Sequence, residues 1–544
     1  MENDILKLGF EKGVIIDKDA FEILKNIEDN DLVKKIIDLM SGEKILTKTS
    51  FAKNIHTFDQ LKDKNGERIS EKISIKLGLK IEIERQINET GELLVESPYF
   101  PENMKVKVLS SVKLPPERLE VKDFVNYYRN RYEYLKSILQ QRPELENLTS
   151  IGKIVGDRNS VSVVGIVYSK RVTKNNNLLI ELEDMTGRTL VLVNHNKPEL
   201  LEKGKELLLD DIIAIKGVGS REMIFVNDIF WPDAFLEEKH SLSKDESAVF
   251  ISDIHVGSKM FLEKNFLKFI SWINGEVGSE EQKQEALKTK YLFIAGDSVD
   301  GVGIFPGQED LLEIKDMRDQ YSKLAELLSM IRKDVTIIIC PGQHDAVRVA
   351  EPQPPPEKEY AEKIYDLDNL IFVGNPCLIE IPDGNKETRG MKILMYHGAS
   401  FHGIVDEIEE LRQSRANDHP TKIVKHVLKR RHLAPSHSSD TTPSKEDFLI
   451  IKDVPDVILT ADLHRPEIDE YHKILIVCSS CWQSITPFEE KVGNNPDPCK
   501  ASLFNLKTRQ IKVLDFSDCE NPDSNFSEDN MKTRNDENLK KEKK

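Results

Sequence analysis

Ala248-Val-Phe-Ile-Ser-Asp-Ile-His255 places an acidic and an imidazole side chain directly after an apolar run. A short run of Val, Phe and Ile bounded by polar residues predicts a buried strand. Asp253 and His255 then follow its carboxyl end. Carboxylate oxygens and imidazole nitrogens are common ligands of divalent metal ions. The stretch therefore predicts a strand that delivers two metal-binding side chains to the edge of a sheet.

Four later segments repeat this arrangement of an apolar run followed by acidic, amide or imidazole side chains. They are Asp297 after 291–294, Gln343-His344-Asp345 after 335–339, His397 after 393–394, and Asp462 with His464 after 457–459. Because α/β sheets place their ligands at the carboxyl ends of strands, we expect these side chains to meet. Two-metal phosphoester hydrolysis needs such a set, with hard oxygens, imidazoles and a shared carboxylate. We predict a two-metal phosphoesterase centre.

Residues 246–516 alternate predicted strands with predicted helices. The helices are expected at 261–273, 309–331 and 401–415, and the last strands at 501–506 and 510–516. Such alternation is typical of α/β folds, in which helices cover the faces of a sheet. We therefore expect an α/β sandwich of the phosphoesterase type over 246–516.

Residues 149–235 change to a period of two, which indicates strands. A short antiparallel set of about five strands is typical of an OB-like β-barrel. OB barrels often bind single-stranded nucleic acid through aromatic side chains on a basic face. This segment offers few such side chains, chiefly Tyr168, Lys170, Arg171 and Lys174. We expect the OB-like domain to serve protein–protein scaffolding rather than DNA binding.

The remaining segments complete a multidomain α+β chain. Apolar residues at helical spacing predict a small helical docking unit over 1–45. Weak patterning predicts a linker over 46–116. Residues 117–148 predict a connecting amphipathic helix, whose basic face we expect to be solvated rather than bound to nucleic acid. Residues 517–544 cannot bury a core and are expected to form a disordered tail.

The composition limits the classes of function. A chain of 544 residues is long enough for several domains. Its net charge of −17 excludes a uniformly basic nucleic-acid binder, so any DNA contact needs a local basic patch or metal ions. No apolar run approaches the roughly 20 residues of a membrane span, and the N-terminus lacks the pattern of a secretory signal. Cys478 and Cys481 have redox or zinc spacing without a second such pair, so we expect structural thiols in a cytoplasmic protein without a membrane partner.

The ordered motifs DxH, GD, GxHD, a lone His-Gly and xxH resemble those of calcineurin-like metallophosphoesterases. Longer stretches narrow this resemblance. They are Asp297-Ser-Val-Asp-Gly-Val-Gly-Ile-Phe-Pro-Gly-Gln308, Pro341-Gly-Gln-His-Asp-Ala-Val-Arg348, Glu351-Pro-Gln-Pro-Pro355 and Leu428-Lys-Arg-Arg-His-Leu-Ala-Pro435. In these the chain resembles the small subunit of archaeal family D DNA polymerase. The resemblance covers 150–516 and the helix before it, and is weak over the first hundred residues.

The resemblance implies a 3′→5′ exonuclease that binds a large catalytic polymerase subunit, acts on DNA 3′ ends and works with a sliding clamp. Carried over by residue, it implies a first metal ion on Asp253, His255 and His464, a second on Gln343, His397 and Asp462, and Asp297 bridging both. His344, supported by Asp345, would then be no ligand but the general acid that protonates the departing 3′ oxygen. Asp300 is expected to orient a ligand.

Two positions depart from the family pattern, and both fall on the second metal. Gln343 stands where the family has Asn, and Asp462 where it has His. Gln reaches further and is less well fixed, while Asp is a harder ligand that favours Mg²⁺ or Mn²⁺. The second site is then either retuned and active, or weakened in a chain that serves mainly as a structural subunit. We expect retained activity, because Asp253, His344 and His397 are all present.

The segment 422–437 is the densest basic stretch beside the site residues. Lys429, Arg430 and Arg431 within it are candidates for gripping the phosphate backbone or the partner subunit, and a solvated helix face is the alternative. Arg348, Phe401 and His402 are candidates for lining the path of the DNA 3′ end.

Overall fold

The computed structural model describes 106–112, 120–154, 159–384, 388–436, 439–444, 446–492 and 494–517, together with parts of 7–51. The chain divides into two compact units, Met1–Glu96 and Ser97–Lys544. Nearly all of the predicted tail and most of the predicted linker lie outside the described residues. Within the described part of the chain, no helix is long and apolar enough to cross a membrane.

The first unit is a small helical body with a two-stranded parallel sheet. Its elements are β1 (Ile15–Ile16), α2 (Lys18–Lys25), α3 (Asn30–Leu39) and β2 (Ile45–Leu46). Leu24 and Ile36 are fully buried in its core, as the helical spacing predicts. Leu46 and Phe51 are also buried there. This core therefore continues past residue 45, the boundary expected from the sequence.

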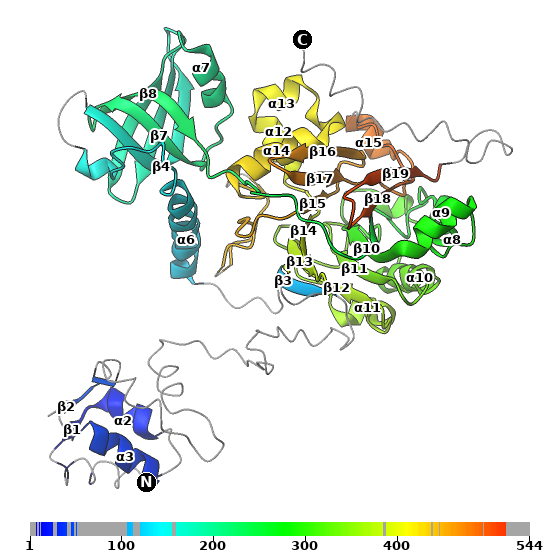
Figure 1. The fold of residues 1–544 in the computed structure, drawn as a ribbon, viewed down its shortest axis with the longest axis horizontal. Helices are drawn as coiled ribbons and strands as arrows, with labels where there is room; N and C mark the ends of the chain where they lie inside the picture. The colour runs from blue at the N-terminus through cyan, green and yellow to red at the C-terminus, as the bar shows by residue number, and fades with distance from the viewer. Residues whose placement is uncertain are drawn as a thin grey trace. The chain divides into compact units, whose positions relative to one another are not determined.

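Two six-stranded sheets form the centre of the second unit (Figure 1). The order of the first sheet is β12 (Leu370–Phe372), β11 (Thr336–Cys340), β10 (Thr289–Ala295), β9 (Ser247–Ile251), β18 (Lys500–Asn505) and β19 (Ile511–Asp515). The four strands from β12 to β9 run parallel, and β18 and β19 continue antiparallel. The strand ending at Ile251 is thus near the middle of its sheet, as its unbroken apolar run requires.

The second sheet combines a parallel centre with antiparallel edges. Its order is β16 (Glu467–Tyr471), β17 (Ile474–Cys478), β15 (Val457–Thr460), β14 (Met391–Tyr396), β13 (Cys377–Ile381) and β3 (Lys107–Ser111). Strands β14, β15 and β17 run parallel. Strand β3 lies in the stretch that the sequence predicts as a linker, 46–116. It is an edge strand whose side chains are mostly exposed, so hydrophobic periodicity gave no signal for it.

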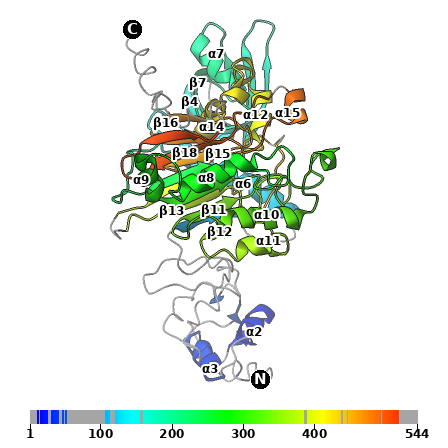
Figure 2. The same cartoon turned by 90° about the vertical axis from the view of Figure 1, so that its right-hand side faces the viewer.

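The two sheets pack face to face, and helices cover their outer faces. Phe250 and Phe293 of the first sheet pack with Met395 of the second in the core between them. Successive residues point to opposite faces of a strand, so Val249 and Ile251 pack on the helices instead. The helices on the first sheet are α8 (Glu263–Ile273), α9 (Glu280–Lys288), α10 (Met317–Ser329) and α11 (Lys358–Tyr365), seen face-on in Figure 2.

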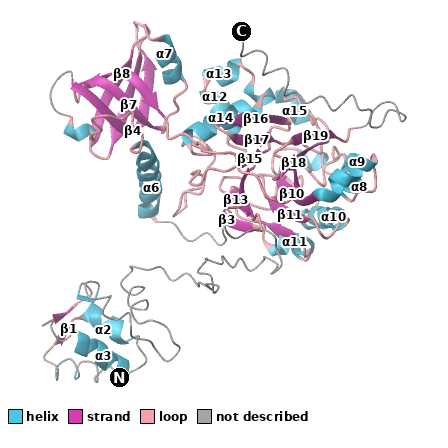
Figure 3. Ribbon diagram, in the orientation of Figure 1, coloured by secondary structure: helices cyan, strands magenta, loops and turns pink. Residues whose placement is uncertain are grey.

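The second sheet carries shorter helices, α12 (Phe401–Glu407), α13 (Glu409–Gln413) and α14 (Pro420–Arg430). The short elements η3 (Gln308–Asp310), η4 (Ala416–Asp418) and α15 (Pro487–Val492) lie in the connections. The alternation of helices and strands is drawn in Figure 3. The mixed α/β class is therefore confirmed, and the described part of 246–516 forms a two-sheet sandwich.

The upstream strands close into a five-stranded barrel, which confirms the predicted barrel. Its strands are β4 (Asn159–Val172), β5 (Leu178–Asp184), β6 (Gly187–Val193), β7 (Ile212–Gly219) and β8 (Met223–Phe230), with η2 (Ile151–Lys153) before them and α7 (Pro198–Lys205) between β6 and β7. Helix α6 (Val121–Leu139) packs on the outside of the barrel through Tyr132, Leu135 and Leu139. The barrel core itself is built mainly from aliphatic residues of its strands, with Trp231 packed among them.

Candidate metal centre

The predicted metal-binding side chains meet at the edge where strands of both sheets end. The connections after β9, β10 and β11 carry Asp253, His255, Asp297, Gln343 and His344, and those after β14 and β15 carry His397, Asp462 and His464. Three groups of these residues have ligand atoms that all lie within 4.8 Å of one another. Asp297 belongs to two of the groups. The structure thus brings together residues separated by as many as 211 positions, from Asp253 to His464.

The backbone at this edge turns sharply to present the side chains. Five site residues have positive φ: Asp253 49°, His255 55°, Asp297 45°, Asp462 68° and His464 55°. Residues other than glycine rarely adopt this left-handed conformation, and such strain concentrates at functional sites. The surrounding sheets therefore hold the backbone in these turns, and the turns fix the positions of the side chains.

The first half of the centre contains Asp253, His255 and His464. The Nε2 atom of His464 lies 3.5 Å from Oδ1 of Asp253 and 3.4 Å from Nε2 of His255. His255 Nε2 is 4.0 Å from Oδ2 of Asp297. These atoms converge as the ligands of one ion would.

The second half contains His397, Gln343 and Asp462. His397 Nε2 lies 3.3 Å from Oδ2 of Asp297 and 3.6 Å from Oδ1 of Asp462. Gln343 Nε2 donates a hydrogen bond to the same Oδ1 of Asp462. The two residues that depart from the family pattern therefore contact each other, and Asp297 faces both halves.

Unpartnered ligand atoms show that this set fits metal ions. Among the described residues, Asp253 Oδ1, Gln343 Oε1, His397 Nε2 and Asp462 Oδ2 are buried without a hydrogen-bond partner. A buried polar atom without a partner costs about 1–3 kcal/mol, and four beside one another need a common explanation. Divalent cations would satisfy all four, since each atom is a carboxylate oxygen, an amide oxygen or an imidazole nitrogen.

The ligand histidines are oriented through their second nitrogens. His255 Nδ1 lies 3.1 Å from Oδ1 of Asp300, as expected for a residue that orients a ligand. His397 Nδ1 donates to the carbonyl of Ala295 at 2.9 Å. His464 Nδ1 lies 2.7 Å from Oε1 of Glu489, a residue that the sequence did not single out. Such partners fix the tautomer and leave Nε2 directed at the metal position.

Glu489 is itself held by a short capping arrangement. Its Oε2 accepts hydrogen bonds from the backbone N–H and the hydroxyl of Thr486, at 2.8 and 2.9 Å. The pattern Thr-x-x-Glu is a sequence signal for a helix start, so it could have indicated α15. Nothing in it points to His464, which lies 25 positions earlier.

His344 lies at the rim of the centre, with one ring nitrogen hydrogen-bonded and the other facing Asp297. Its Nδ1 donates to the carbonyl of Asp300 at 2.7 Å, and its Nε2 lies 3.9 Å from Oδ2 of Asp297. Among the described residues, the side chain of Asp345 makes no hydrogen bond or ion pair with the His344 ring. Asp345 instead accepts hydrogen bonds from Tyr321 Oη at 2.9 Å and from the Gly342 N–H at 2.9 Å.

The electrostatics follow from burial beside several imidazoles. Burial opposes ionisation of Asp297, but the neighbouring His397 and His344 hold the pKa of its carboxyl well below its usual range. Burial, together with the charge of Asp297, raises the pKa of Asp345 to about 6. The bridging position thus favours a charged carboxylate, while Asp345 sits where charge is disfavoured.

Comparisons with known proteins agree with this geometry. The family model that describes the B subunits of DNA polymerases alpha and epsilon matches 248–469. The DNA polymerase II small subunit of Methanothermobacter thermautotrophicus is 38% identical over 401 residues, covering 73% of this chain and 80% of that protein. The protein of the same description from Pyrococcus furiosus is 37% identical over 425 residues, covering 75% and 67%. The chain belongs to the family of archaeal DNA polymerase II small subunits. This confirms the resemblance drawn from its motifs.

As a member of this family, the chain is the small subunit of a two-part polymerase, which implies a large catalytic subunit as its partner. A solved structure described as a novel archaeal phosphodiesterase is 12% identical and covers 49% of this chain and 98% of that one. Its TM-score of 0.25 is too low to bear on the fold.

The basic residues at the end of α14 and directly after it make contacts within the chain, and their role as DNA contacts stays a prediction. Arg430 is buried and pairs with Asp211 at 2.9 Å. Lys429 lies 4.0 Å above the ring of Trp231. Arg431 donates to the carbonyl of Ile451 at 3.0 Å; Lys429 also pairs with Glu206. Two basic residues of this segment therefore pair with acidic residues of the barrel domain, Glu206 and Asp211.

The three residues expected along the DNA path differ in their contacts and exposure. Arg348 donates to the carbonyl of Pro352 at 2.8 Å, and Phe401 is fully buried against Tyr396. Both side chains therefore make contacts within the chain, and their place along the DNA path stays a prediction. His402 alone has an exposed side chain at the centre, with Nε2 3.4 Å from Oδ2 of Asp462.

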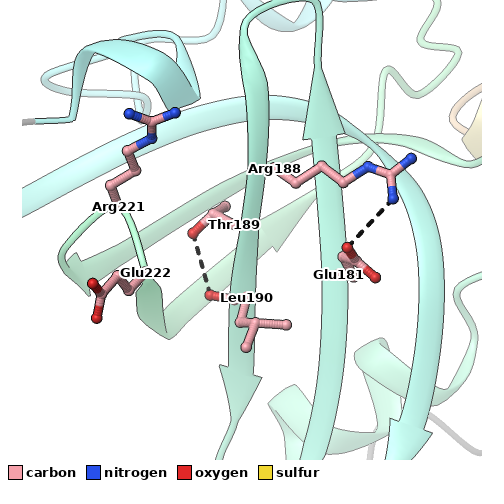
Figure 4. A pocket seen from close by; sticks show the side chains of 6 residues that line it. All are labelled: Glu181, Arg188, Thr189, Leu190, Arg221 and Glu222. Carbon is pink, nitrogen blue, oxygen red and sulfur yellow. Dashed lines mark hydrogen bonds and ion pairs between the residues drawn. The ribbon is translucent and has the colours of Figure 1, made fainter.

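The barrel of the small subunit carries a separate hollow of about 420 Å³ (Figure 4). It is lined by Glu181, Arg188, Thr189, Leu190, Arg221 and Glu222. Arg188 pairs with Glu181 at 3.6 Å and covers the ring of Tyr168 at 3.6 Å. Charges of both signs line this hollow, and the aromatic ring beside it is already covered, so it lacks the basic aromatic face typical of single-strand binding.

Proposed function

We propose that this small subunit is the proofreading 3′→5′ exonuclease of its polymerase, hydrolysing the terminal phosphodiester of a DNA 3′ end. The observation that supports it is Asp297, an ionised carboxylate that belongs to two groups of possible ligands and lies beside four buried polar atoms without a hydrogen-bond partner among the described residues. Such a set suits a pair of divalent ions, which when bound supply Lewis acidity and a water of lowered pKa. In this proposal Asp253, His255 and His464 hold one ion, His397, Gln343 and Asp462 the other, and Asp297 bridges.

His344 is the residue of this chain that we assign to proton transfer. Its Nδ1–H is committed to the carbonyl of Asp300, so Nε2 is the nitrogen available to a substrate. From there Nε2–H gives its proton to the 3′ oxygen that leaves, and the terminal nucleotide departs with the phosphate. A positioned general acid of this kind contributes roughly 10²–10⁴-fold to the rate.

The donor set also indicates which ions act. The second half offers the oxygens of Gln343 and Asp462 where the family pattern has Asn and His. Oxygen donors suit Mg²⁺ and Mn²⁺ better than softer ions. We infer that Mn²⁺ or Mg²⁺ is the working metal of this chain.

A second candidate is an assembly subunit with weak or lost nuclease activity. The hydrogen bond between Gln343 and Asp462 favours it, because it engages one oxygen of a ligand. The purified chain, alone and with its large subunit, separates the two when given Mn²⁺ and a single-stranded oligonucleotide. Release of nucleotides supports the exonuclease; release in neither preparation supports the assembly role. Binding to a sliding clamp is part of the same proposal and is tested by co-purification.

A further inference from the structure

The second half-site lacks the imidazole that its family places at 462, yet an imidazole lies beside that position. His402 Nε2 is 3.4 Å from Oδ2 of Asp462. That oxygen is buried, and among the described residues no hydrogen bond reaches it. The other oxygen of Asp462 is engaged by Gln343. His402 therefore faces the carboxylate oxygen of Asp462 that accepts no hydrogen bond from the described residues.

Two pairs of side chains in this half have separations that fit neighbouring ligand atoms on an ion. Ligand atoms about 2.1 Å from a metal, at tetrahedral or octahedral angles, lie roughly 3.0–3.5 Å apart. His397 Nε2 is 3.3 Å from Asp297 Oδ2, and His402 Nε2 is 3.4 Å from Asp462 Oδ2. The first half shows the same spacing, 3.5 Å between His464 Nε2 and Asp253 Oδ1. His402 fits the pattern of the ligands already identified.

The backbone fixes His402 in this place. It follows His397 by five positions: His397 comes directly after β14, and His402 is in the first turn of α12. Between them, Phe401 is fully buried against Tyr396, with ring centroids 5.6 Å apart. The side chain of His402 is 48% exposed although its Nε2 faces inward to Asp462. It is thus anchored by its neighbour but open to the solvent side of the centre.

We propose that His402 is a ligand of the second metal ion, supplying the imidazole that Asp462 does not. The ligands of the second ion would then be Asp297, His397, Asp462 and His402, with the amide oxygen of Gln343 beside them. This rests on the proposed two-metal function. In this chain the imidazole of His402 would compensate for the imidazole that is missing at 462.

The test measures ions rather than cleavage. Mn²⁺ is titrated into the full-length protein and into His402→Ala, with stoichiometry from calorimetry and the exchange-coupled pair read by electron paramagnetic resonance. We expect the wild type to bind two ions. His402→Ala should keep the first ion at unchanged affinity and weaken the second by at least tenfold, with loss of the coupled signal. His419→Ala is the matched control, since His419 is also half-exposed but pairs with Glu467 at 3.2 Å, away from the centre.

A rescue separates a ligand from a residue that only orients Asp462. The double variant His402→Ala, Asp462→His restores an imidazole at 462 and should regain the second ion and the coupled signal. Retention of both ions at wild-type affinity in His402→Ala would overturn the proposal, even if cleavage were lost, because His402 would then be a substrate contact. A wild type that binds one ion would overturn both this inference and the two-metal function. Two ions without cleavage, one of them dependent on His402, would overturn the exonuclease alone.

Discussion

Each ligand histidine is held by a partner on the nitrogen that faces away from the metal position, and the three partners differ in kind. Asp300 serves His255, a backbone carbonyl serves His397, and Glu489 serves His464. A carboxylate partner both fixes the tautomer and increases the basicity of the ring. The first half-site therefore depends on two acidic residues that never touch the ion.

Glu489→Gln tests this dependence. The variant keeps the shape of the side chain but removes its charge, so the ring of His464 is held less firmly. We expect the affinity for the first ion to fall about 10–100-fold, measured by Mn²⁺ titration. Glu490→Gln, one residue further along the same helix and exposed, should leave it unchanged. An unchanged affinity in Glu489→Gln would show that the contact is only structural.

His344→Ala should remove proton transfer while sparing the metal sites. We expect the cleavage rate to fall by roughly 10²–10⁴-fold, because Nε2 of His344 is the nitrogen that remains free at the rim. Mn²⁺ stoichiometry, measured on the same sample, should stay at the wild-type value. Loss of a bound ion in this variant would make His344 a ligand instead of the acid.

The sequence predicted which side chains meet at the sheet edge, because each of them follows a buried strand. Asp253 and Asp297 are such cases. Glu489 could not be predicted, since it lies on a short helix outside the strand pattern and meets His464 only through tertiary packing. The internal partners of the basic residues could not be predicted either, because a charge in a sequence does not reveal its partner: Arg430 pairs with Asp211, 219 positions away.

At the scale of elements, α14 is the piece that joins the sandwich to the barrel. Arg430 and Asp211 are both almost completely buried, at 2% and 1% side-chain exposure. Breaking a buried ion pair leaves an uncompensated charge and costs about 3–5 kcal/mol. The helix also carries a solvent-exposed pair, Lys425 with Asp469. One element thus offers both a buried and a surface pair for comparison.

Arg430→Ala should lower the free energy of unfolding by about 3–5 kcal/mol, measured by chemical denaturation. Lys425→Ala, the matched surface variant on the same helix, should lower it by less than about 1 kcal/mol. A double variant, Arg430→Met with Asp211→Leu, should recover most of the loss because no buried charge is left alone. Equal effects of the two single variants would contradict the buried pair.

The same helix predicts a pH dependence of stability through His426. Burial, with the nearby charges of Arg430 and Lys429, lowers the pKa of His426 to about 3. The folded state therefore prefers the neutral ring, so its contribution is complete above the unfolded pKa of about 6.5 and is lost as pH falls toward 3. Glu410 lies 3.5 Å away but is 62% exposed, so solvent screens it.

From pH 8 to pH 5, the wild type should lose about 2 kcal/mol of folding free energy that His426→Gln does not lose. Denaturation curves of both proteins at the two pH values measure the difference. Parallel pH profiles would show that His426 titrates in the folded protein as it does in the unfolded chain.

At the scale of the molecule, the acidic balance and the internal contacts of α14 favour the proposed metal centre as the place where DNA would bind. The net charge is −17. Lys429 and Arg430, which were predicted to contact DNA, pair with acidic residues of the barrel domain. A DNA strand is repelled by such an acidic protein, so its binding needs cations that offset the repulsion. We therefore expect that assembly with the large subunit and the proposed hydrolysis can be separated by experiment.

Exonuclease activity at the two-metal centre is tested most directly on a 5′-labelled single-stranded oligonucleotide. It is incubated with the small subunit, its large subunit and Mn²⁺, beside the same complex carrying Asp297→Asn. We expect a ladder of products shortened from the 3′ end with release of mononucleotides, and loss of that ladder by at least about a hundredfold when the bridging carboxylate is neutralised. An intact oligonucleotide in the wild-type complex, or an equal ladder from both complexes, would contradict hydrolysis at this centre.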